Sequence, residues 1–385
     1  AAESPTILFE RHDRMTISRN YALAIDASRT TVSQPTGTES YALNLIRALL
    51  QLDTAYQWQL YFRDHPPLQL FPRNDRVEHY VIPVPRLWSH LGLAWGMVRR
   101  PPAGLFIPAH IRPLFCLAPT VVTVHDLGYL HFPDTYPWQQ RAYLDAATRY
   151  SSRHAEHILA DSKATRGDLI DHYDIEASKI TVVHPGFDHT PFTNAQRAAR
   201  RGDLPSTYLL HVGTLQPRKN LLRLLEALAR LRNHAAKPTL VLVGQHGWLD
   251  TPIRQQVKRL GLEARVRFLG YVSQSDLPSL YAHATAYVAP SLYEGFGFTP
   301  LEAMACGTPS VAFDVGGIGD AVKHLSTGYL AKYLDTEDLA DGITKFLDNK
   351  ELGRYVSLNA SKLIEKEFNS LVQADRFVDL YHNLL

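Results

Sequence analysis

Glu294 and Glu302 stand eight residues apart in SLYEGFGFTPLEAMACGTP, residues 291–309, the segment with the clearest capacity for chemistry. An apolar run at 286–289 predicts a strand that leads into this segment. A glycine-rich turn follows the strand, and Pro300 is expected to begin a helix that carries Glu302 in its first turn. The two carboxylates are therefore predicted to lie at the carboxyl end of a strand and the start of a helix.

The turn between the two glutamates is suited to bind an anion. Gly295 and Gly297 let the backbone approach a ligand closely, and the free amides of Phe298 and Thr299 at the helix start can hold a negative group. The alternative is a tight turn with a carboxylate near a helix N-terminus, which stabilises many helices without any further function.

Two cations occupy a similar position after another predicted strand. The apolar run 208–212 leads into GTLQPRKN, in which Arg218 and Lys219 stand near the start of a helix. A diphosphate gives up its hydration where fixed positive charge and amides replace it, and these side chains suit that task. The alternative is a solvated surface pair.

The first half of the chain offers weaker signals. A turn at 35–38 contains Gly37 between the first predicted strand and the first predicted helix, and a plain strand-to-helix turn explains it as well. His125 ends the predicted strand 120–125, where a histidine is often structural. Asp161 and Ser162 end another strand, where the favoured role is an N-cap for the helix from Lys163.

Apolar runs of strand length alternate with segments of helical period, the pattern of βα units in parallel sheets. Strands are predicted at 21–26, 58–62, 79–84, 105–108, 120–125, 157–160, 180–184, 208–212, 239–243, 266–269, 286–289 and 310–313, with clear helices at 40–52, 219–231 and 251–260. We expect an α/β fold of two doubly wound, Rossmann-like domains that face each other across a cleft. The expected boundaries are an N-terminal acceptor-side domain at 1–192, a linker at 193–205, a C-terminal donor-binding domain at 206–360, and a terminal helix at 361–385 that packs back on the N-terminal domain.

Composition excludes several classes of protein. The 385 residues carry a formal net charge of +2, far from the concentrated basic charge of a nucleic-acid-binding domain. The two cysteines give neither a disulfide framework nor a zinc-ligand spacing. The first 20 residues have no uninterrupted apolar stretch typical of a signal peptide, so a cytoplasmic protein is expected.

The glutamate segment resembles the E-x7-E signature of retaining GT-B glycosyltransferases, and its surroundings resemble glycosyltransferase family four, with mannosyltransferase-like members. The resemblance covers roughly residues 21–349 and includes TVVTVHDLGYL, VVHPGFD, HVGTLQPRKN, LVGQHGWLD and FLGYVSQSDL in the family's order. The chain departs from the family in having Gly37 as the only glycine of its loop and Asp320 where glutamate is usual.

The resemblance implies a role for each matching residue. Glu294 would bind hydroxyls of the donor sugar, and Glu302 those of the nucleotide ribose. Arg218 and Lys219 would hold the diphosphate, and His125 would contact the sugar near its 6-hydroxyl. The remaining donor-binding residues implied by the resemblance are Gly37, Phe296, Gly297, Phe298, Thr299 and Val272.

The expected reaction is the transfer of a hexosyl group, with mannosyl favoured, from a nucleotide diphosphate-sugar to a saccharide or lipid-linked acceptor. No Asp-x-Asp triplet occurs in the sequence, and many other glycosyltransferases hold a divalent metal with that triplet. We therefore expect no metal and no cofactor. The alternatives are a GT-B epimerase or phosphorylase and a non-catalytic sugar-nucleotide-binding protein. A Rossmann dehydrogenase is disfavoured because no G-x-G-x-x-G follows the first strand of either domain.

One further stretch suggests a membrane partner. No acidic residue occurs between Glu78 and Asp126, although the stretch contains several arginines, among them Arg86, Arg99, Arg100 and Arg112. Within it, Leu87, Trp88, Leu91, Ala94, Trp95 and Val98 recur at helical spacing. This pattern is typical of a short interfacial helix on the anionic inner face of the plasma membrane. The favoured alternative is that the stripe packs on the sheet and the arginines are solvated.

Overall fold

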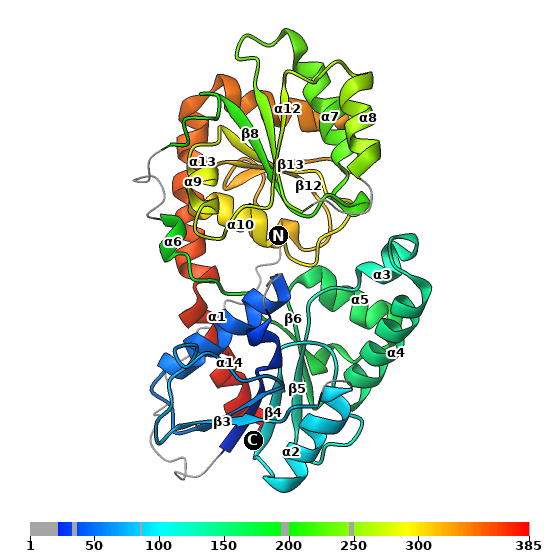
Figure 1. The fold of residues 1–385 in the computed structure, drawn as a ribbon, viewed down its shortest axis with the longest axis vertical. Coiled ribbons are helices and arrows are strands. Elements are labelled where there is room, and N and C mark those ends of the chain that lie inside the picture. Colours follow the sequence, from blue (N-terminus) through cyan, green and yellow to red (C-terminus); the bar gives the residue numbers. More distant parts are fainter. Residues whose placement is uncertain (1–21, 33–36, 85–86, 194–199, 246–249, 385) are drawn as a thin grey trace, which may run out of the picture.

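The computed structural model describes residues 22–32, 37–84, 87–193, 200–245 and 250–384. The first 21 residues, Pro35, Thr36 and Arg86 lie outside this part of the chain, and so do residues 194–199 of the linker expected at 193–205. Two α/β domains are stacked along the long axis of the molecule (Figure 1). This architecture confirms the predicted fold class.

The N-terminal domain is built on a seven-stranded parallel sheet in the order β3-β2-β1-β4-β5-β6-β7. Its strands are β1 (Ala22–Asp26), β2 (Gln57–Phe62), β3 (Val77–Val81), β4 (Gly104–Ile107), β5 (Thr120–Val124), β6 (His157–Ala160) and β7 (Ile180–Val182). Successive residues of a strand point to opposite faces, so Leu23 and Ile25 enter one core and Ala24 the other.

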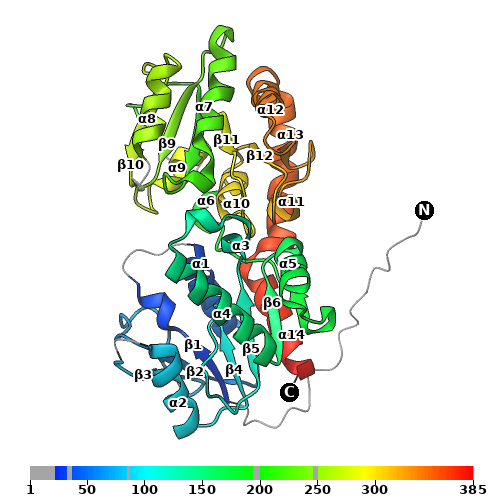
Figure 2. The same cartoon turned by 90° about the vertical axis from the view of Figure 1, so that its right-hand side faces the viewer.

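Helices cover both faces of this sheet. The core that contains Leu23 is closed by α1 (Gly37–Gln51) and α14 (Ser370–Leu384). The core that contains Ala24 is closed by residues of α2 (Ala94–Arg99) and α5 (Lys163–Tyr173), with α4 (Trp138–His154) packed nearby. The short helix α3 (Gly128–His131) follows β5 on the side that faces the other domain (Figure 2).

The C-terminal domain has a six-stranded parallel sheet in the order β10-β9-β8-β11-β12-β13. Its strands are β8 (Tyr208–Val212), β9 (Thr239–Val243), β10 (Val266–Gly270), β11 (Ala286–Ala289), β12 (Ser310–Phe313) and β13 (Gly328–Ala331). One face packs on α9 (Leu277–Ala282), α10 (Phe298–Ala305) and α13 (Lys350–Leu363), and the other on α7 (Leu221–Arg230), α8 (Asp250–Arg259) and α12 (Thr336–Asp348).

The chain crosses between the domains twice. Val183 still belongs to the first core, whereas Phe187 already packs in the same core as Tyr208. Near the end, a π-helical turn (Ile364–Phe368) extends α13 beside the second domain, and Phe377 of α14 lies in the first. The first crossing lies before the polar stretch expected as the linker, and the second lies after residue 360.

Local differences from the sequence-based expectations have simple causes. Helix α10 begins at Phe298, ahead of Pro300, because proline fits within the first helical turn, where its missing N–H would have no partner. A 3-10 turn (Pro217–Lys219) precedes α7, so Arg218 and Lys219 stand on that turn. Strand β13 was not predicted.

The predicted apolar stripe of the acid-free stretch is divided between two sides. Trp88 and Ala94 are buried, as is Met97, whereas Leu87, Leu91, Trp95 and Val98 are exposed. A Cβ atom on Gly96 would lie 2.7 Å from the Tyr61 ring, so glycine lets this helix rest on β2. Neither alternative is therefore wholly right for the stripe, because one side packs on the sheet and the other faces outward.

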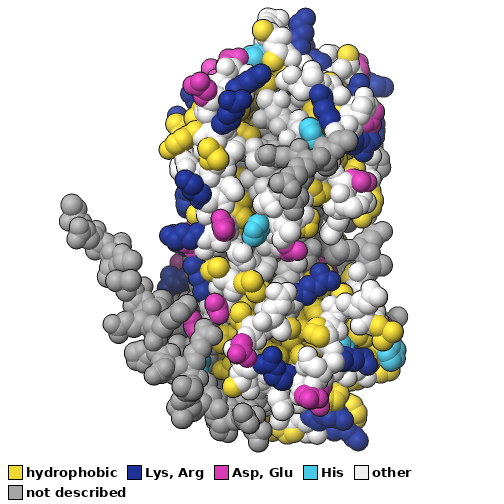
Figure 3. Space-filling view, turned by 90° about the vertical axis from the view of Figure 1, so that its left-hand side faces the viewer, with side chains coloured by type: hydrophobic (Ala, Val, Ile, Leu, Met, Phe, Trp, Pro, Cys, Tyr) yellow, Lys and Arg dark blue, Asp and Glu magenta, His cyan; other side chains and the backbone are white. Residues whose placement is uncertain are grey.

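Charge is distributed without a dominant basic patch on the face of the molecule that Figure 3 shows. Lys and Arg side chains are interspersed there with Asp and Glu over both domains. Arg112, one of the arginines of the acid-free stretch, is buried and donates to the carbonyl oxygens of Pro113 and Cys116. It is therefore not a solvated surface charge.

Candidate active site at the junction of the two domains

The predicted cations and Glu294 meet because their strands are neighbours. β8 and β11 pair in parallel, so the turns that follow them lie at the same edge of the sheet. The order of strands reverses between them: from β8 the chain proceeds outward to β9 and β10 on one side, and from β11 to β12 and β13 on the other. Ligands of open α/β sheets bind at such a point. Arg218 and Lys219 come from the turn after β8, and Glu294 from the turn after β11.

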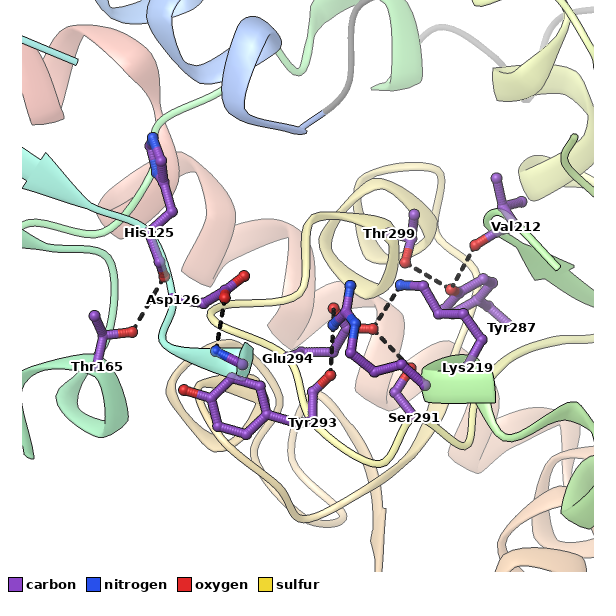
Figure 4. Close-up of polar contacts among 12 residues, drawn as sticks. His125, Asp126, Thr165, Val212, Lys219, Tyr287, Ser291, Tyr293, Glu294 and Thr299 are labelled. Atoms are coloured by element: carbon purple, nitrogen blue, oxygen red, sulfur yellow. Dashed lines mark hydrogen bonds and ion pairs between the residues drawn. The ribbon is translucent and has the colours of Figure 1, made fainter. Parts of the chain in front are cut away.

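Glu294 accepts hydrogen bonds on both carboxylate oxygens (Figure 4). Lys219 Nζ lies 2.6 Å and Ser291 Oγ 2.7 Å from Oε1, and Arg218 Nη1 lies 3.1 Å from Oε2. Burial raises the pKa of Glu294, but the two cations outweigh it and lower that pKa to about 2. The group is a permanent carboxylate that can accept hydrogen bonds from hydroxyls, and it is not a proton donor near neutral pH.

Glu302 has the opposite environment although it belongs to the same motif. It lies in α10, where its Oε2 accepts a hydrogen bond from Tyr281 Oη at 2.8 Å. Burial raises the pKa of Glu302 to about 7, and the bond from Tyr281 opposes this rise only in part. The carboxylate is therefore costly to ionise until a ligand supplies further donors.

The start of α10 supplies amides beside a residue of the other domain. Gly297 caps the helix with a φ of 101°, a left-handed conformation that favours glycine. The first N–H groups of any helix have no partner within it, so those of Phe298 and Thr299 can bind a ligand. A Cβ atom on Gly37, at the start of α1, would lie 3.4 Å from the Phe298 ring. The fold thus brings Gly37 to this helix start.

Three other predicted donor residues have side chains engaged in the fold. The Phe296 ring is buried and stacks on His184, with ring centroids 5.5 Å apart. The hydroxyl of Thr299 accepts a bond of 2.7 Å from Tyr287. Val272, after β10, packs against the same core as Leu301. For Phe296 only the backbone is left for a ligand, whereas Thr299 still has its hydroxyl proton to donate and Val272 has a partly buried surface.

His125 is held by its own domain. Its Nδ1 lies 2.8 Å from Asp161 Oδ2 and its Nε2 lies 3.2 Å from the carbonyl oxygen of Pro108, while Tyr41 packs edge-on against the ring. Burial lowers the pKa of His125, but the charge of Asp161 and its hydrogen bond outweigh this and raise it. The helix N-cap role falls to Ser162, which accepts from the Thr165 amide, so Asp161 positions His125.

Loops of the C-terminal domain contact the N-terminal domain around this group. A Cβ atom on Gly295 would overlap the backbone oxygen of His125 and lie 2.6 Å from Asp126 Cβ. Tyr293 Oη donates to Asp168 Oδ2 at 2.7 Å. The amide of Lys163 donates to Asp320 Oδ2 at 2.7 Å. Asp320, which stands where the family usually has glutamate, therefore bridges the two domains.

Sequence reasoning missed several residues that complete the arrangement. Ser291 could have been found, because it stands three positions before Glu294 in the same turn. Tyr281 and Asp168 left no such signal, since each reaches its partner only through the tertiary fold. Asp161 was named at the end of its strand, but its contact with His125 was not predicted.

Comparison with known proteins supports the predicted resemblance. Residues 35–191 match the family model described as Glycosyltransferase Family 4, and residues 193–363 match that of Glycosyl transferases group 1. The chain is 35% identical over 241 residues to the O-antigen chain mannosyltransferase B of Escherichia coli, over 60% of this chain and 61% of the relative. It is 38% identical over 194 residues to a D-inositol 3-phosphate glycosyltransferase of Salinispora tropica, over 46% and 40% of the two chains. Both alignments span less than two thirds of the relative.

Solved structures share the fold. HepE of Anabaena, in complex with UDP and glucose, matches with a TM-score of 0.74 and 21% identity over 94% of this chain and 100% of that one. Sucrose-phosphate synthase of Thermosynechococcus elongatus matches with a TM-score of 0.75 and 21% identity over 95% and 99%. Within the described part of this chain, no helix is long and apolar enough to cross a membrane.

Proposed function

The chain belongs to the family 4 and group 1 glycosyltransferases of the GT-B fold, and we propose that it transfers a hexosyl group from a nucleotide diphosphate-sugar to a hydroxyl of a saccharide or lipid-linked acceptor. The observation that carries this proposal is the contact of Glu294 with Lys219 and Arg218 at the strand ends that face the N-terminal domain. A carboxylate for sugar hydroxyls and cations for a diphosphate stand side by side there.

The donor would bind along the start of α10. Glu302 accepts hydrogen bonds from the ribose hydroxyls, which replace the water that burial has removed from its carboxylate. The amides of Phe298 and Thr299, with Arg218 and Lys219, hold the diphosphate. Glu294 orients the hexose through its hydroxyls, and its carboxylate also keeps the two cations in position. The backbones of Phe296 and Gly297 complete this side, with Val272 at its edge.

The N-terminal domain would contribute Gly37 and His125. Gly37 leaves room for the diphosphate next to Phe298, and His125 contacts the sugar. Both ring nitrogens of His125 face acceptors, the Asp161 carboxylate and the Pro108 carbonyl, so the ring would act as a hydrogen-bond donor near the transferred hexose. It would exchange its contact with the Pro108 carbonyl for one with the sugar.

The reaction is proposed to retain the anomeric configuration without a metal ion. The bond between the anomeric carbon and the β-phosphate oxygen breaks, and the acceptor oxygen bonds to the same face of that carbon. The departing phosphate oxygen takes the proton of the acceptor hydroxyl. Arg218, Lys219 and the helix-start amides stabilise the negative charge that develops on the leaving diphosphate, a contribution of several kcal/mol per well-placed donor.

A mannosyl donor is favoured by the similarity to the O-antigen chain mannosyltransferase B. Another relative is a D-inositol 3-phosphate glycosyltransferase, so the relatives do not share one substrate. The donor and acceptor of this chain therefore have to be found by experiment. A thermal-shift screen with UDP, GDP, ADP and their sugars identifies the nucleotide, since a bound ligand stabilises the folded state by mass action. Consumption of the stabilising donor with a saccharide acceptor then tests transfer.

Three variants test the assigned roles. Glu302→Ala and Lys219→Ala are expected to weaken nucleotide binding, and Glu294→Ala to lower turnover with a smaller effect on nucleotide affinity. Glu263→Ala, an exposed glutamate of the same domain, is the control. Unchanged nucleotide affinity in both of the first two variants would eliminate the proposed donor site. A donor that binds but is not consumed with any acceptor would favour the non-catalytic alternative.

We also propose that the N-terminal domain rests on an anionic membrane surface. Leu91, Trp95 and Val98 are 57%, 53% and 57% exposed on the outer side of α2 and the π-helical turn (Ser89–Leu93) before it, and Leu87, ahead of that turn, is 62% exposed. The Arg99 guanidinium lies over the Trp95 ring, 5.1 Å from its centroid. An apolar surface with adjacent cations suits the boundary of an anionic bilayer, where each basic side chain contributes about 1 kcal/mol.

Sedimentation with anionic liposomes tests the membrane contact. Salt-sensitive binding by the wild type is expected, with weaker binding by Arg99→Glu/Arg100→Glu. Arg141→Glu, a charge reversal at an exposed position of α4, serves as the matched control. Absence of binding by the wild type would refute the membrane contact and leave a soluble acceptor.

A further inference from the structure

His131, Asp168 and His172 gather on the N-terminal domain beside the contact with its partner domain. His131 is the last residue of α3, and the other two lie one helical turn apart on α5. Figure 2 shows α3 and α5 on the side of the N-terminal domain toward the other domain. One possible ligand atom from each lies within 4.8 Å of the others. The set combines imidazole nitrogens with a carboxylate oxygen, which are ligands that zinc prefers.

The distances suit a small coordination sphere. His131 Nε2 lies 2.9 Å from Asp168 Oδ1. Ligand atoms about 2 Å from zinc in a tetrahedral site are roughly 3.3 Å apart, so this pair, now in direct contact, needs to separate by only about 0.4 Å to share an ion. Asp168 and His172 project from the same face of α5 because they are four positions apart. His172 is exposed, and its ring packs edge-on against that of His131, with centroids 5.8 Å apart.

Tyr293 supports two of these side chains from the other domain. Its hydroxyl donates to the second carboxylate oxygen of Asp168 at 2.7 Å. Its ring stacks on His131, with centroids 4.7 Å apart and planes 25° from parallel. Metal-ligating carboxylates and histidines are generally held by such outer contacts, which orient them toward the ion. The contacts that hold these two side chains thus come from Tyr293 of the other domain, outside the cluster itself.

We propose that His131, Asp168 and His172 form a binding site for a zinc-type divalent cation, with Tyr293 as an outer partner from the C-terminal domain. The two imidazoles disfavour magnesium and calcium, which prefer oxygen ligands. With three protein ligands, the fourth position of the ion is open to water. The site is separate from the donor contacts of Arg218 and Lys219 and does not depend on the proposed transferase activity.

The site couples metal binding to the arrangement of the domains. Tyr293 precedes Glu294, and its carbonyl oxygen accepts a bond of 2.7 Å from Arg218. A cation bound to Asp168 and His131 would fix the groups that Tyr293 contacts, and so favour the arrangement in which the two domains meet. By linkage, the same arrangement strengthens metal binding.

The direct test is zinc binding by the untagged full chain after exhaustive dialysis against a chelator. Competition with a chromophoric zinc chelator is expected to give one site per chain, and X-ray absorption of the loaded protein is expected to show two imidazoles and oxygen ligands. His131→Ala and His172→Ala should each remove this binding, and both positions are exposed enough for the variants to fold. Tyr293→Phe should weaken it by about 10- to 100-fold, the usual effect of losing an outer partner.

His234→Ala is the matched control, because His234 also pairs with an aspartate, Asp348, at 3.0 Å. Its zinc affinity should equal that of the wild type. Absence of binding by the wild type, or equal binding by the His131 and His172 variants, would overturn the proposal. Unchanged affinity in Tyr293→Phe would refute the role given to the partner domain.

Discussion

Replacement of the two glutamates of the motif by glutamine is expected to change stability in opposite directions. Glu302→Gln removes a buried carboxylate that the fold ionises at a cost, and the amide oxygen can still accept the Tyr281 hydroxyl. Glu294→Gln removes a carboxylate that two cations stabilise, and leaves Lys219 and Arg218 without their anion. At pH 8 the expected order of stability is Glu302→Gln, then wild type, then Glu294→Gln.

The magnitudes follow from the pKa values. The pKa of Glu302 rises from its ordinary 4.5 to about 7, and each pKa unit corresponds to about 1.4 kcal/mol. Ionised Glu302 therefore costs at most about 3 kcal/mol of unfolding free energy. The pKa of Glu294 falls from 4.5 to about 2, so its ionised form contributes a similar amount with the opposite sign. In a domain of this size, 1 kcal/mol moves the melting temperature by about 2–4 °C.

The pH dependence separates the two effects. Because the folded pKa of Glu302 is raised, its cost is absent below pH 4.5, grows as the pH rises to about 7, and is constant above that. The stability gained by Glu302→Gln should thus be much larger at pH 8 than at pH 5. Because the folded pKa of Glu294 is lowered, its contribution is present above pH 4.5 and is lost as the pH falls toward 2. The loss in Glu294→Gln should be the same at pH 5 and pH 8.

Calorimetry at pH 5 and pH 8 measures these differences, with the transition of the C-terminal domain fitted separately because two domains need not unfold together. Glu263→Gln, at an exposed position, controls for a simple change of charge. If Glu302→Gln is no more stable than the wild type at pH 8, the assigned burial cost is wrong. If Glu302→Gln is more stable but binds the nucleotide more weakly, the free-energy cost of ionising buried Glu302 is one that the bound nucleotide offsets.

Three further outcomes are expected. Transfer should continue in excess EDTA, because the cations of the donor site are side chains; complete loss that magnesium or manganese restores would refute the metal-free mechanism. Gly295→Ala should lower turnover and increase the radius of gyration in X-ray scattering, because a methyl group there overlaps the His125 backbone; an unchanged radius and rate would contradict the observed domain contact. Asp161→Asn should lower the pKa of His125, which Asp161 now raises; an NMR titration in which the pKa stays the same would exclude Asp161 as the cause.

Local patterns in the sequence were enough to predict most of the framework. Strands β8, β9, β11 and β12 were predicted at their observed bounds, because short apolar runs between turn residues are buried on both faces of a parallel sheet. The position of Glu294 after a strand was predictable for the same reason. Strand β13 begins at Gly328 and contains no β-branched residue, so its local pattern is weak. The side of α2 that faces outward was not predictable either, since both sides are apolar.

Tertiary structure alone decided which distant groups meet. Lys219 and Glu294 are 75 residues apart, and Tyr293 and Asp168 are 125 apart. These contacts depend on the order of strands in each sheet and on the contact between the domains, which no local pattern encodes. The same is true of the two glutamates, which are identical as sequence letters. One is buried beside two cations and the other beside a tyrosine hydroxyl, so the fold lowers the pKa of the first and raises that of the second.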